Sequence, residues 1–176
     1  TALTIAGSDS GGGAGIQADL KTFHRFGVYG TSAVTLVTAQ NTTGVQRVEL
    51  LAPDLVVAQI DAVACDFEVA AAKTGALGSA AIVAVVAEAV ARHRIARLVV
   101  DPVMISKHGH ALLDASAIDV LRRALLPRAA LLLLCAAYVL PGVFGRDPWK
   151  NADLTAFGQM LSMAEGRSSW LAPTLG

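Results

Sequence analysis

Short, almost continuously apolar segments of the chain alternate with longer segments in which apolar residues recur every three to four positions. Continuous apolar runs of about five residues are typical of strands covered on both faces, and the longer periodic segments are typical of helices. The expected strands cover residues 2–6, 32–37, 69–73, 98–101 and 131–135. This alternation predicts crossover units on a mainly parallel sheet, which is an α/β fold.

Helix boundaries can be predicted from capping residues and from the first and last members of each apolar stripe. The second stripe, for example, repeats at Val56, Ile60, Val63 and Phe67. Helices are expected to begin near Gly15, at Asp54 and Ser79, which can each act as an N-cap, and at Asp114. After residue 128 the pattern weakens, but no repeat or linker divides the chain, so one domain is predicted over residues 1–176.

Composition narrows the class of protein. Hydrophobic residues make up 54% of the 176 residues and charged residues 16%, which excludes a disordered segment. The formal net charge of +0 predicts no nucleic acid and no anionic membrane as partner. The longest apolar run, residues 129–140, is shorter than the roughly 18 residues of a membrane span. We therefore expect a cytoplasmic protein with a small-molecule substrate, and the sequence leaves a homo-oligomer open.

The two cysteines, Cys65 and Cys135, lie in apolar stretches and share no metal-binding spacing. They are predicted to be reduced thiols in the core.

The strongest local signal is the segment GSDSGGGAG at residues 7–15, between an expected strand and an expected helix. Glycines allow close approach of a ligand, and ligands of open α/β sheets bind at the carboxyl ends of strands. A phosphate-binding Walker loop would end in GK[ST], but Gly15 is followed by Ile16 and Gln17. Residues 13–18 match the dinucleotide pattern GxGxxA, yet no acid follows between Asp19 and Glu49 to bind a ribose. A dinucleotide site is therefore a weaker alternative, and a flexible connector is another.

Two polar residues could line a pocket beneath this loop. Asp19 lies one turn into the first expected helix, beside its apolar stripe, although a solvated acid near the helix start would fit equally well. Gln40 directly follows an apolar strand, and its amide offers a donor and an acceptor that match the edge of an aminopyrimidine ring. Its neighbour Asn41 is equally well explained as a turn residue.

Asp101 ends another expected strand, and Lys107 follows in a loop. A carboxylate at that edge can hold magnesium or its waters, and a lysine can neutralise a transferring phosphate. The alternative is ordinary turn chemistry with a solvated lysine. His108 and His110 lack a third ligand at metal-binding spacing and are expected to be exposed loop residues.

Several long motifs resemble hydroxymethylpyrimidine/phosphomethylpyrimidine kinase, the thiamine-biosynthesis member of the ribokinase-like superfamily. They are LTIAGSDSGGGAGIQADLK at 3–21, GVYG at 27–30, VTAQNT at 37–42, KTGALG at 73–78 and DPVM at 101–104. They occur in the order of that family, and the resemblance covers residues 1–127. It implies a central, mainly parallel sheet between helical layers, and transfer of the γ-phosphoryl group of ATP, with Mg²⁺, to hydroxymethylpyrimidine and then to its monophosphate.

The resemblance also implies roles for individual residues. The pyrimidine pocket of the family maps onto Gly7, Asp19, Gln40, Ala76 and Val103. Asp101 would lie near magnesium and the phosphates, and Lys107 matches a lysine of the phosphate-binding loop. Ala76 replaces a methionine frequent in the family and leaves a roomier pocket wall.

Residues 128–176 depart from the family pattern. The family's TPN-x-x-E segment and its GTG[CD] segment, which forms the anion hole, do not occur before Gly176. Loss of one anion-hole donor typically lowers the rate about 10² to 10³-fold, so a chain without the whole segment is expected to show negligible turnover. The expected pocket residues lie within residues 1–127, so the 176-residue chain is still expected to bind the pyrimidine. Two explanations stay open: a truncated kinase, or a catalytically silent module that binds a pyrimidine or pyridoxal-type ligand.

Overall fold

The computed structural model of the chain describes residues 1–104 and 112–132, which lie within one compact unit, Thr1–Leu133. The strands are β1 (Ala2–Asp9), β2 (Gly30–Asn41), β3 (Gly44–Leu50), β4 (Ala71–Thr74), β5 (Leu98–Val100) and β6 (Leu131–Leu132). The helices are α1 (Gly15–Arg25), α2 (Pro53–Asp66), α3 (Ala80–Arg92) and α4 (Ala115–Val120). A π-helical turn (Leu121–Leu125) and a 3₁₀ turn (Leu126–Arg128) continue α4. The prediction of a single domain over 1–176 extends beyond the described residues and stays a prediction.

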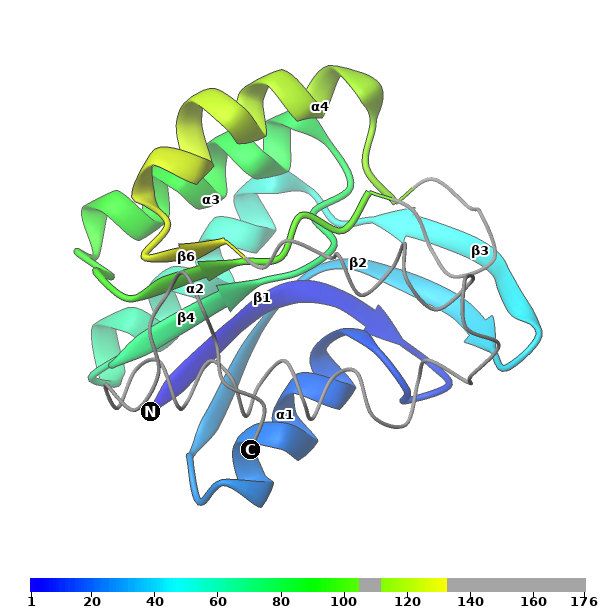
Figure 1. Ribbon diagram of the computed structural model, residues 1–176, viewed down its shortest axis with the longest axis horizontal. Coiled ribbons are helices and arrows are strands. Elements are labelled where there is room, and N and C mark those ends of the chain that lie inside the picture. Colours follow the sequence, from blue (N-terminus) through cyan, green and yellow to red (C-terminus); the bar gives the residue numbers. More distant parts are fainter. Residues whose placement is uncertain (105–111, 133–176) are drawn as a thin grey trace, which may run out of the picture. The chain divides into compact units, whose positions relative to one another are not determined.

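The strands form one sheet in the order β3-β2-β1-β4-β5-β6. Every neighbouring pair is parallel except β2 and β3, which form an antiparallel hairpin. Helix α1 lies on one face of the sheet, and α2, α3 and α4 lie on the other (Figure 1). The three-layer α/β fold with a mainly parallel sheet is therefore confirmed.

The main core lies between the sheet and the layer formed by α2, α3 and α4. Leu3 and Ile5 of β1 reach it from the central strand, and both are fully buried. Helix α3 contributes most of the helical side, as its apolar stripe predicts, with Ile82, Val86 and Ala89 buried. Because β1 pairs with strands on both sides, this core fixes the centre of the sheet.

Two helix starts illustrate where capping signals succeed and fail. Ser79 is the N-cap of α3, and its hydroxyl accepts a hydrogen bond from the Ile82 N–H, as expected. Helix α2 instead begins with Ala52 at the N-cap and Pro53 in the first position, and Asp54 lies inside the first turn. The prediction of Asp54 as the cap is wrong because proline, with its fixed φ, is itself well suited to the first helical position.

Strand β3 was not expected from the sequence. It lies at the edge of the sheet, and only Val45 among its residues is buried, so the strand lacks the continuous apolar character of the inner strands. The connecting turn is formed by Asn41, whose Oδ1 accepts hydrogen bonds from the N–H groups of Thr43 and Gly44. Asn41 is therefore a turn residue.

The prediction of a buried thiol at Cys65 is wrong, because this residue is exposed. Cys65 lies nine positions after the buried Val56, which is about half a turn around the helix, on the solvent side of α2. Cys135 lies outside the described residues. In the described ranges, no helix is both long and apolar enough to span a membrane.

Candidate active site

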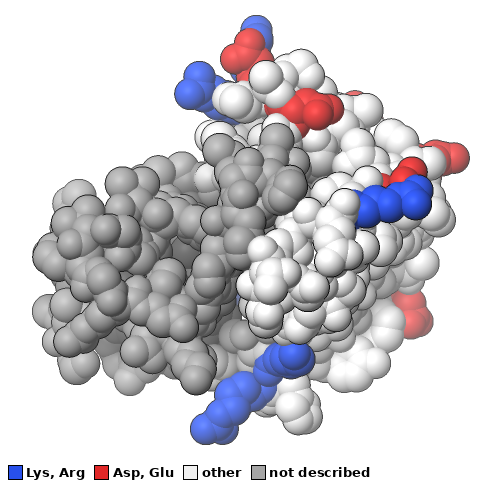
Figure 2. All heavy atoms as spheres, turned by 90° about the vertical axis from the view of Figure 1, so that its right-hand side faces the viewer, with Lys and Arg blue, Asp and Glu red and all other residues white. Residues whose placement is uncertain are grey.

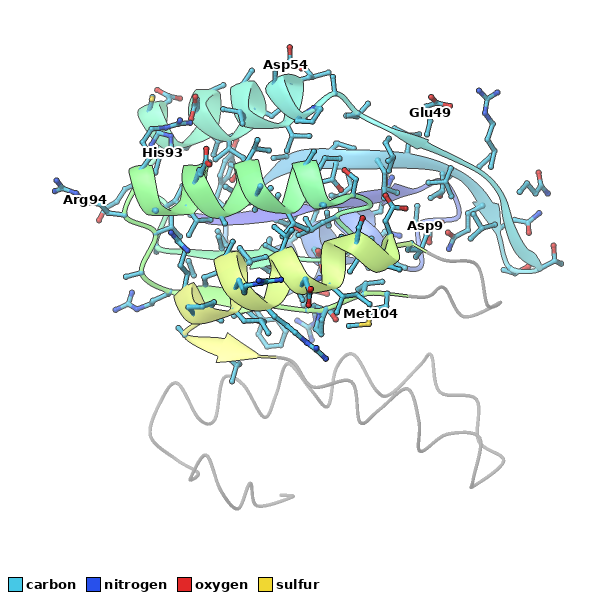
Figure 3. All side chains as sticks on the ribbon, turned by 90° about the horizontal axis from the view of Figure 1, so that it is seen from above. Asp9, Glu49, Asp54, His93, Arg94 and Met104 are labelled. Atoms are coloured by element: carbon cyan, nitrogen blue, oxygen red, sulfur yellow. The ribbon has the colours of Figure 1, made fainter. Side chains whose placement is uncertain are left out.

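The polar residues singled out by the sequence and described by the structure form two groups near the ends of the parallel strands, one around the glycine loop and one around Lys73. Figure 3 shows Asp9 and Met104 at this carboxyl-terminal edge of the sheet, while His93 and Arg94 lie at the opposite end of the molecule. The edge is formed by the ends of β1, β4 and β5 together with the loop that connects β1 to α1. Ligands of open α/β sheets bind at this edge.

The loop from β1 to α1 is folded around the side chain of Asp9. The Asp9 carboxylate is buried, and it accepts hydrogen bonds from the N–H groups of Gly11 (2.8 Å), Gly13 (3.0 Å) and Ala14 (2.9 Å). Gly15 has a φ of 59°, and a Cβ there would lie 2.3 Å from the Gly7 carbonyl oxygen. Only glycine can therefore begin α1 this close to β1. The loop is an ordered structure, which argues against a flexible connector.

Gln40 is brought to this loop by the adjacent strand. The Ser10 hydroxyl donates to the Gln40 carbonyl oxygen (2.6 Å) and accepts from the Gln40 N–H (2.7 Å). The Gln40 side chain is half-buried, and its Oε1 lies 3.4 Å from the Thr38 hydroxyl. The backbone of Gln40 is thus held beside the loop, and the expected role of its side-chain amide in ligand binding stays a prediction.

Asp19 faces the sheet from α1. Its Oδ2 accepts a hydrogen bond from the Thr4 hydroxyl (2.6 Å), and its Oδ1 lies 3.1 Å from the Lys73 ammonium of β4. The side chain of Asp19 is 14% exposed, and that of Lys73 is 22% exposed. Asp19 is therefore a held, partly buried carboxylate and not a solvated acid.

Lys73 also connects Asp19 to Asp101. Its ammonium lies 3.7 Å from Asp101 Oδ2, immediately after β5. Two carboxylates from distant parts of the chain thus lie within 4 Å of one cation. In the described ranges there is no cluster of three or more His, Cys, Asp or Glu side chains that could hold a metal ion by itself. Magnesium, however, is usually bound through one or two carboxylates together with substrate phosphates and waters. The expected role of Asp101 near magnesium stays a prediction.

The remaining predicted site residues have less defined surroundings. The Ala76 carbonyl oxygen accepts a hydrogen bond from the Thr35 hydroxyl (2.6 Å), which fixes the backbone after β4. The Val103 N–H donates to the Asp101 carbonyl oxygen (2.9 Å), so Val103 lies just beyond the carboxylate. Gly7 packs against β2, since a Cβ there would lie 2.6 Å from Leu36 Cδ1. Lys107, with His108 and His110, lies outside the described residues.

The sequence interpretation did not assign roles to Asp9 and Lys73. Asp9 could have been found as a carboxylate that precedes a run of glycines, because short acidic side chains commonly bind nearby backbone N–H groups. Lys73 could have been found as a charged residue within an otherwise apolar strand. Such a residue needs a partner when it is partly buried.

On the face shown in Figure 2, Lys, Arg, Asp and Glu side chains of the described residues are few, and both signs occur. A shallow hollow on the β2–β3 hairpin is lined by Val37, Thr38, Ala39, Arg47 and Glu49. It adjoins Gln40 along β2 but contains none of the predicted site residues.

With this geometry established, comparison with known proteins decides the family. The family model described as phosphomethylpyrimidine kinase matches residues 9–134. The chain belongs to this family. It is 58% identical over 131 residues to the hydroxymethylpyrimidine/phosphomethylpyrimidine kinase of Synechococcus elongatus, covering 74% of this chain and 49% of that protein. The corresponding enzyme of Salmonella typhimurium is 51% identical over the same length. The chain spans about half the length of these relatives.

Solved structures of the family agree. A phosphomethylpyrimidine kinase from Clostridium difficile superposes with a TM-score of 0.70 at 49% identity, covering 74% of this chain and 57% of that one. A pyridoxal kinase from Staphylococcus aureus, solved with pyridoxal, superposes with a TM-score of 0.66 at 34% identity, covering 74% and 47%. The resemblance to phosphomethylpyrimidine kinases and the ribokinase-like fold are thereby confirmed.

Proposed function

We propose that the chain is part of a kinase that transfers the γ-phosphoryl group of ATP to hydroxymethylpyrimidine and to hydroxymethylpyrimidine monophosphate. The observation that supports this proposal is that residues of the family's motifs, distant in the chain, are in contact near the ends of the parallel strands. Ser10 holds Gln40 beside the glycine loop, and Lys73 holds Asp19 near Asp101. The identity of 58% with a named kinase of this specificity supports the choice of substrate.

In this proposal each residue has a chemical role. Gln40 pairs through its amide with the donor and acceptor edge of the aminopyrimidine ring. Gly7 and Asp19 form the floor of the pocket, and Ala76 and Val103 supply apolar contacts to the ring. Phosphoryl transfer depends mainly on positioning and on stabilisation of charge, so these contacts serve to orient the hydroxymethyl group.

The same proposal places the phosphates and magnesium on the side of β5. Asp101 would hold Mg²⁺ or its waters, and Lys107 would contact a phosphate. Magnesium would supply neutralisation of the charge that develops on the phosphate oxygens. The Lys73 ammonium offsets part of the negative charge of Asp19 and Asp101. Without this cation the two carboxylates would repel the negatively charged ATP more strongly.

Binding of the pyrimidine tests the proposal directly. Replacing Gln40 with leucine keeps the size of the side chain but leaves the ring edge unpaired. The binding free energy of hydroxymethylpyrimidine should therefore become less favourable by about 1 to 3 kcal/mol. Isothermal titration calorimetry of the 176-residue chain measures this change. Gln46→Leu, the same exchange at an exposed position of β3, is the matched control. Equal affinity of the Gln40 and Gln46 variants would contradict the proposed role of Gln40.

Two further titrations test the alternatives. The similarity to pyridoxal kinases of known structure makes pyridoxal the second candidate ligand, and tighter binding of pyridoxal than of hydroxymethylpyrimidine would favour it. Titration with NAD tests the dinucleotide alternative. We expect no binding of NAD, because Asp9 already occupies amides of the loop that would receive a pyrophosphate. An ADP-release assay on the same sample, with and without Mg²⁺, measures turnover.

A further inference from the structure

The glycine loop contains an internal anion. Three loop N–H groups, those of Gly11, Gly13 and Ala14, converge on the two carboxylate oxygens of Asp9 at 2.8 to 3.0 Å. Of these, the N–H groups of Gly13 and Ala14 are consecutive and share Oδ2 of Asp9, while that of Gly11 binds Oδ1. Converging backbone N–H groups of this kind form a nest, an arrangement that otherwise binds phosphate. In this chain the position of the anion is taken by a side chain of the loop itself.

Asp9 is also held through its backbone. Its N–H donates to Gln17 Oε1 (2.8 Å), and its carbonyl oxygen accepts from the Gly12 N–H (2.9 Å). Gln17 is oriented in turn by donating from Nε2 to the Ser8 hydroxyl (2.8 Å). Asp9 is only 5% exposed, so the carboxylate cannot leave the nest without losing several hydrogen bonds at once.

One cation, the ammonium of Lys21, lies beside the loop. The Lys21 ammonium binds the carbonyl oxygen of Gly12 (2.7 Å), so this cation is engaged on the carbonyl side of the loop. A phosphate approaching the nest would meet the negative charge of Asp9 and would have to displace it. Displacement would leave a buried carboxylate without its donors, which is strongly unfavourable.

We propose that Asp9 is a specificity-determining residue, which fills the amide nest of the glycine loop and thereby excludes phosphate from it. The loop then accepts only an uncharged part of a ligand. If the loop belongs to the pyrimidine site, as the proposed function has it, this exclusion decides how the substrate is oriented. The pyrimidine ring lies against the loop, and the hydroxymethyl group or its phosphate points away from Asp9, toward the side of Asp101.

Amide resonances of the three loop residues provide a test that does not require turnover. In ¹H–¹⁵N spectra of the whole 176-residue chain, inorganic phosphate should cause no saturable shift of the Gly11, Gly13 and Ala14 resonances. A saturable shift of these amides by phosphate in the wild-type chain would overturn the inference.

Removal of the carboxylate should reverse this behaviour. In Asp9→Ala the three N–H groups lose their acceptor, and the affinity of the loop for inorganic phosphate should rise about tenfold or more, the factor expected for one charge-assisted hydrogen bond. Asp54→Ala, at an exposed position in α2, is the control, and its loop amides should show no saturable shift with phosphate. If Asp9→Ala does not fold, Asp9→Ser serves, since its side chain is uncharged and too short to fill the nest. A folded Asp9 variant whose loop amides show no saturable shift with phosphate would overturn the inference.

A third measurement separates this inference from the proposed function. Hydroxymethylpyrimidine and its monophosphate should shift the three loop amides equally, because the added phosphate lies elsewhere. An additional shift of these amides by the monophosphate would overturn the proposed orientation. If neither compound binds while the phosphate experiments give the expected result, the proposed function fails and the role of Asp9 stands.

Discussion

Lys73 shows how one residue can organise a site that the chain assembles from three distant segments. Its ammonium lies near carboxylate oxygens of Asp19 in α1 and of Asp101 after β5, at 3.1 and 3.7 Å. All three side chains are less than one quarter exposed, so solvent screens their charges less than it screens surface pairs. The cation keeps two partly buried carboxylates close together.

Lys73→Met should therefore lower the free energy of unfolding by about 2 to 3 kcal/mol, because the two carboxylates would lose the cation between them. Urea unfolding at neutral pH measures this change. Lys73→Arg, which keeps the charge, should lower the free energy of unfolding by less than Lys73→Met does. The control is Arg47→Met, since Arg47 pairs with Glu49 at the exposed edge of the sheet and should contribute little. A loss in Lys73→Met no larger than in the control would show that the ammonium is not needed there.

Contacts between elements add a second electrostatic feature, at the junction of α2 and the end of α3. Asp61 of α2 lies 2.6 Å from His93 Nε2 and 2.5 Å from Arg92 Nη2. The hydrogen bond from His93, followed by that from Arg92, holds the pKa of the Asp61 carboxyl below its usual value of 3.8. The side chain of Asp61 is 38% exposed, so the stabilising effect is limited by solvent screening.

The lowered pKa of Asp61 predicts a pH dependence of stability. A carboxyl whose pKa is lower in the folded state stabilises the protein above the unfolded-state pKa, and this stabilisation is lost as the pH falls through the folded-state pKa. At about pH 5 and above, Asp61→Asn should be less stable than the wild type by about 0.5 to 1 kcal/mol, and the difference should shrink below about pH 4.

Urea unfolding at several pH values measures this difference, with the exposed Asp54→Asn as control. A difference for Asp61→Asn that stays constant from neutral pH to pH 2 would contradict the assigned cause.

At the scale of the whole molecule, the sheet is most strongly held at its centre. Strand β1 pairs with β2 and with β4, and its residues Leu3, Ile5 and Ala6 are fully buried. Strand β3 has only Val45 buried, and in the described sheet it pairs only with β2. The stability of backbone hydrogen bonds should therefore decrease from β1 toward β3.

Hydrogen exchange measured by NMR should follow this gradient. The amides of Leu3 and Ile5 should exchange through global unfolding, because they lie in the central strand. The paired amides of β3 should exchange faster, through local opening of the hairpin. Equal protection of β1 and β3 would instead indicate that the hairpin unfolds together with the centre of the sheet.

Sequence patterns determined the central architecture because continuous apolar strands and helical stripes are local signals. They predicted every described strand except β3, and they identified Ser79 as the cap of α3. The same patterns missed β3 and misplaced the start of α2, since an edge strand has little buried surface and proline can begin a helix without a side-chain cap. The motifs shared with the kinase family were also readable, because they are contiguous in the chain.

Tertiary structure alone decided how the site residues are paired. The sequence predicted Gln40 and Asp101 at strand ends and Asp19 in the first helix, but it does not specify which side chains meet across 54 positions, as Lys73 and Asp19 do. The sequence likewise showed a glycine loop that a ligand can approach closely, and only the folded loop shows that the Asp9 carboxylate binds its N–H groups. These outcomes depend on the register of neighbouring strands and on the path of the loop, which the packing of the whole sheet sets.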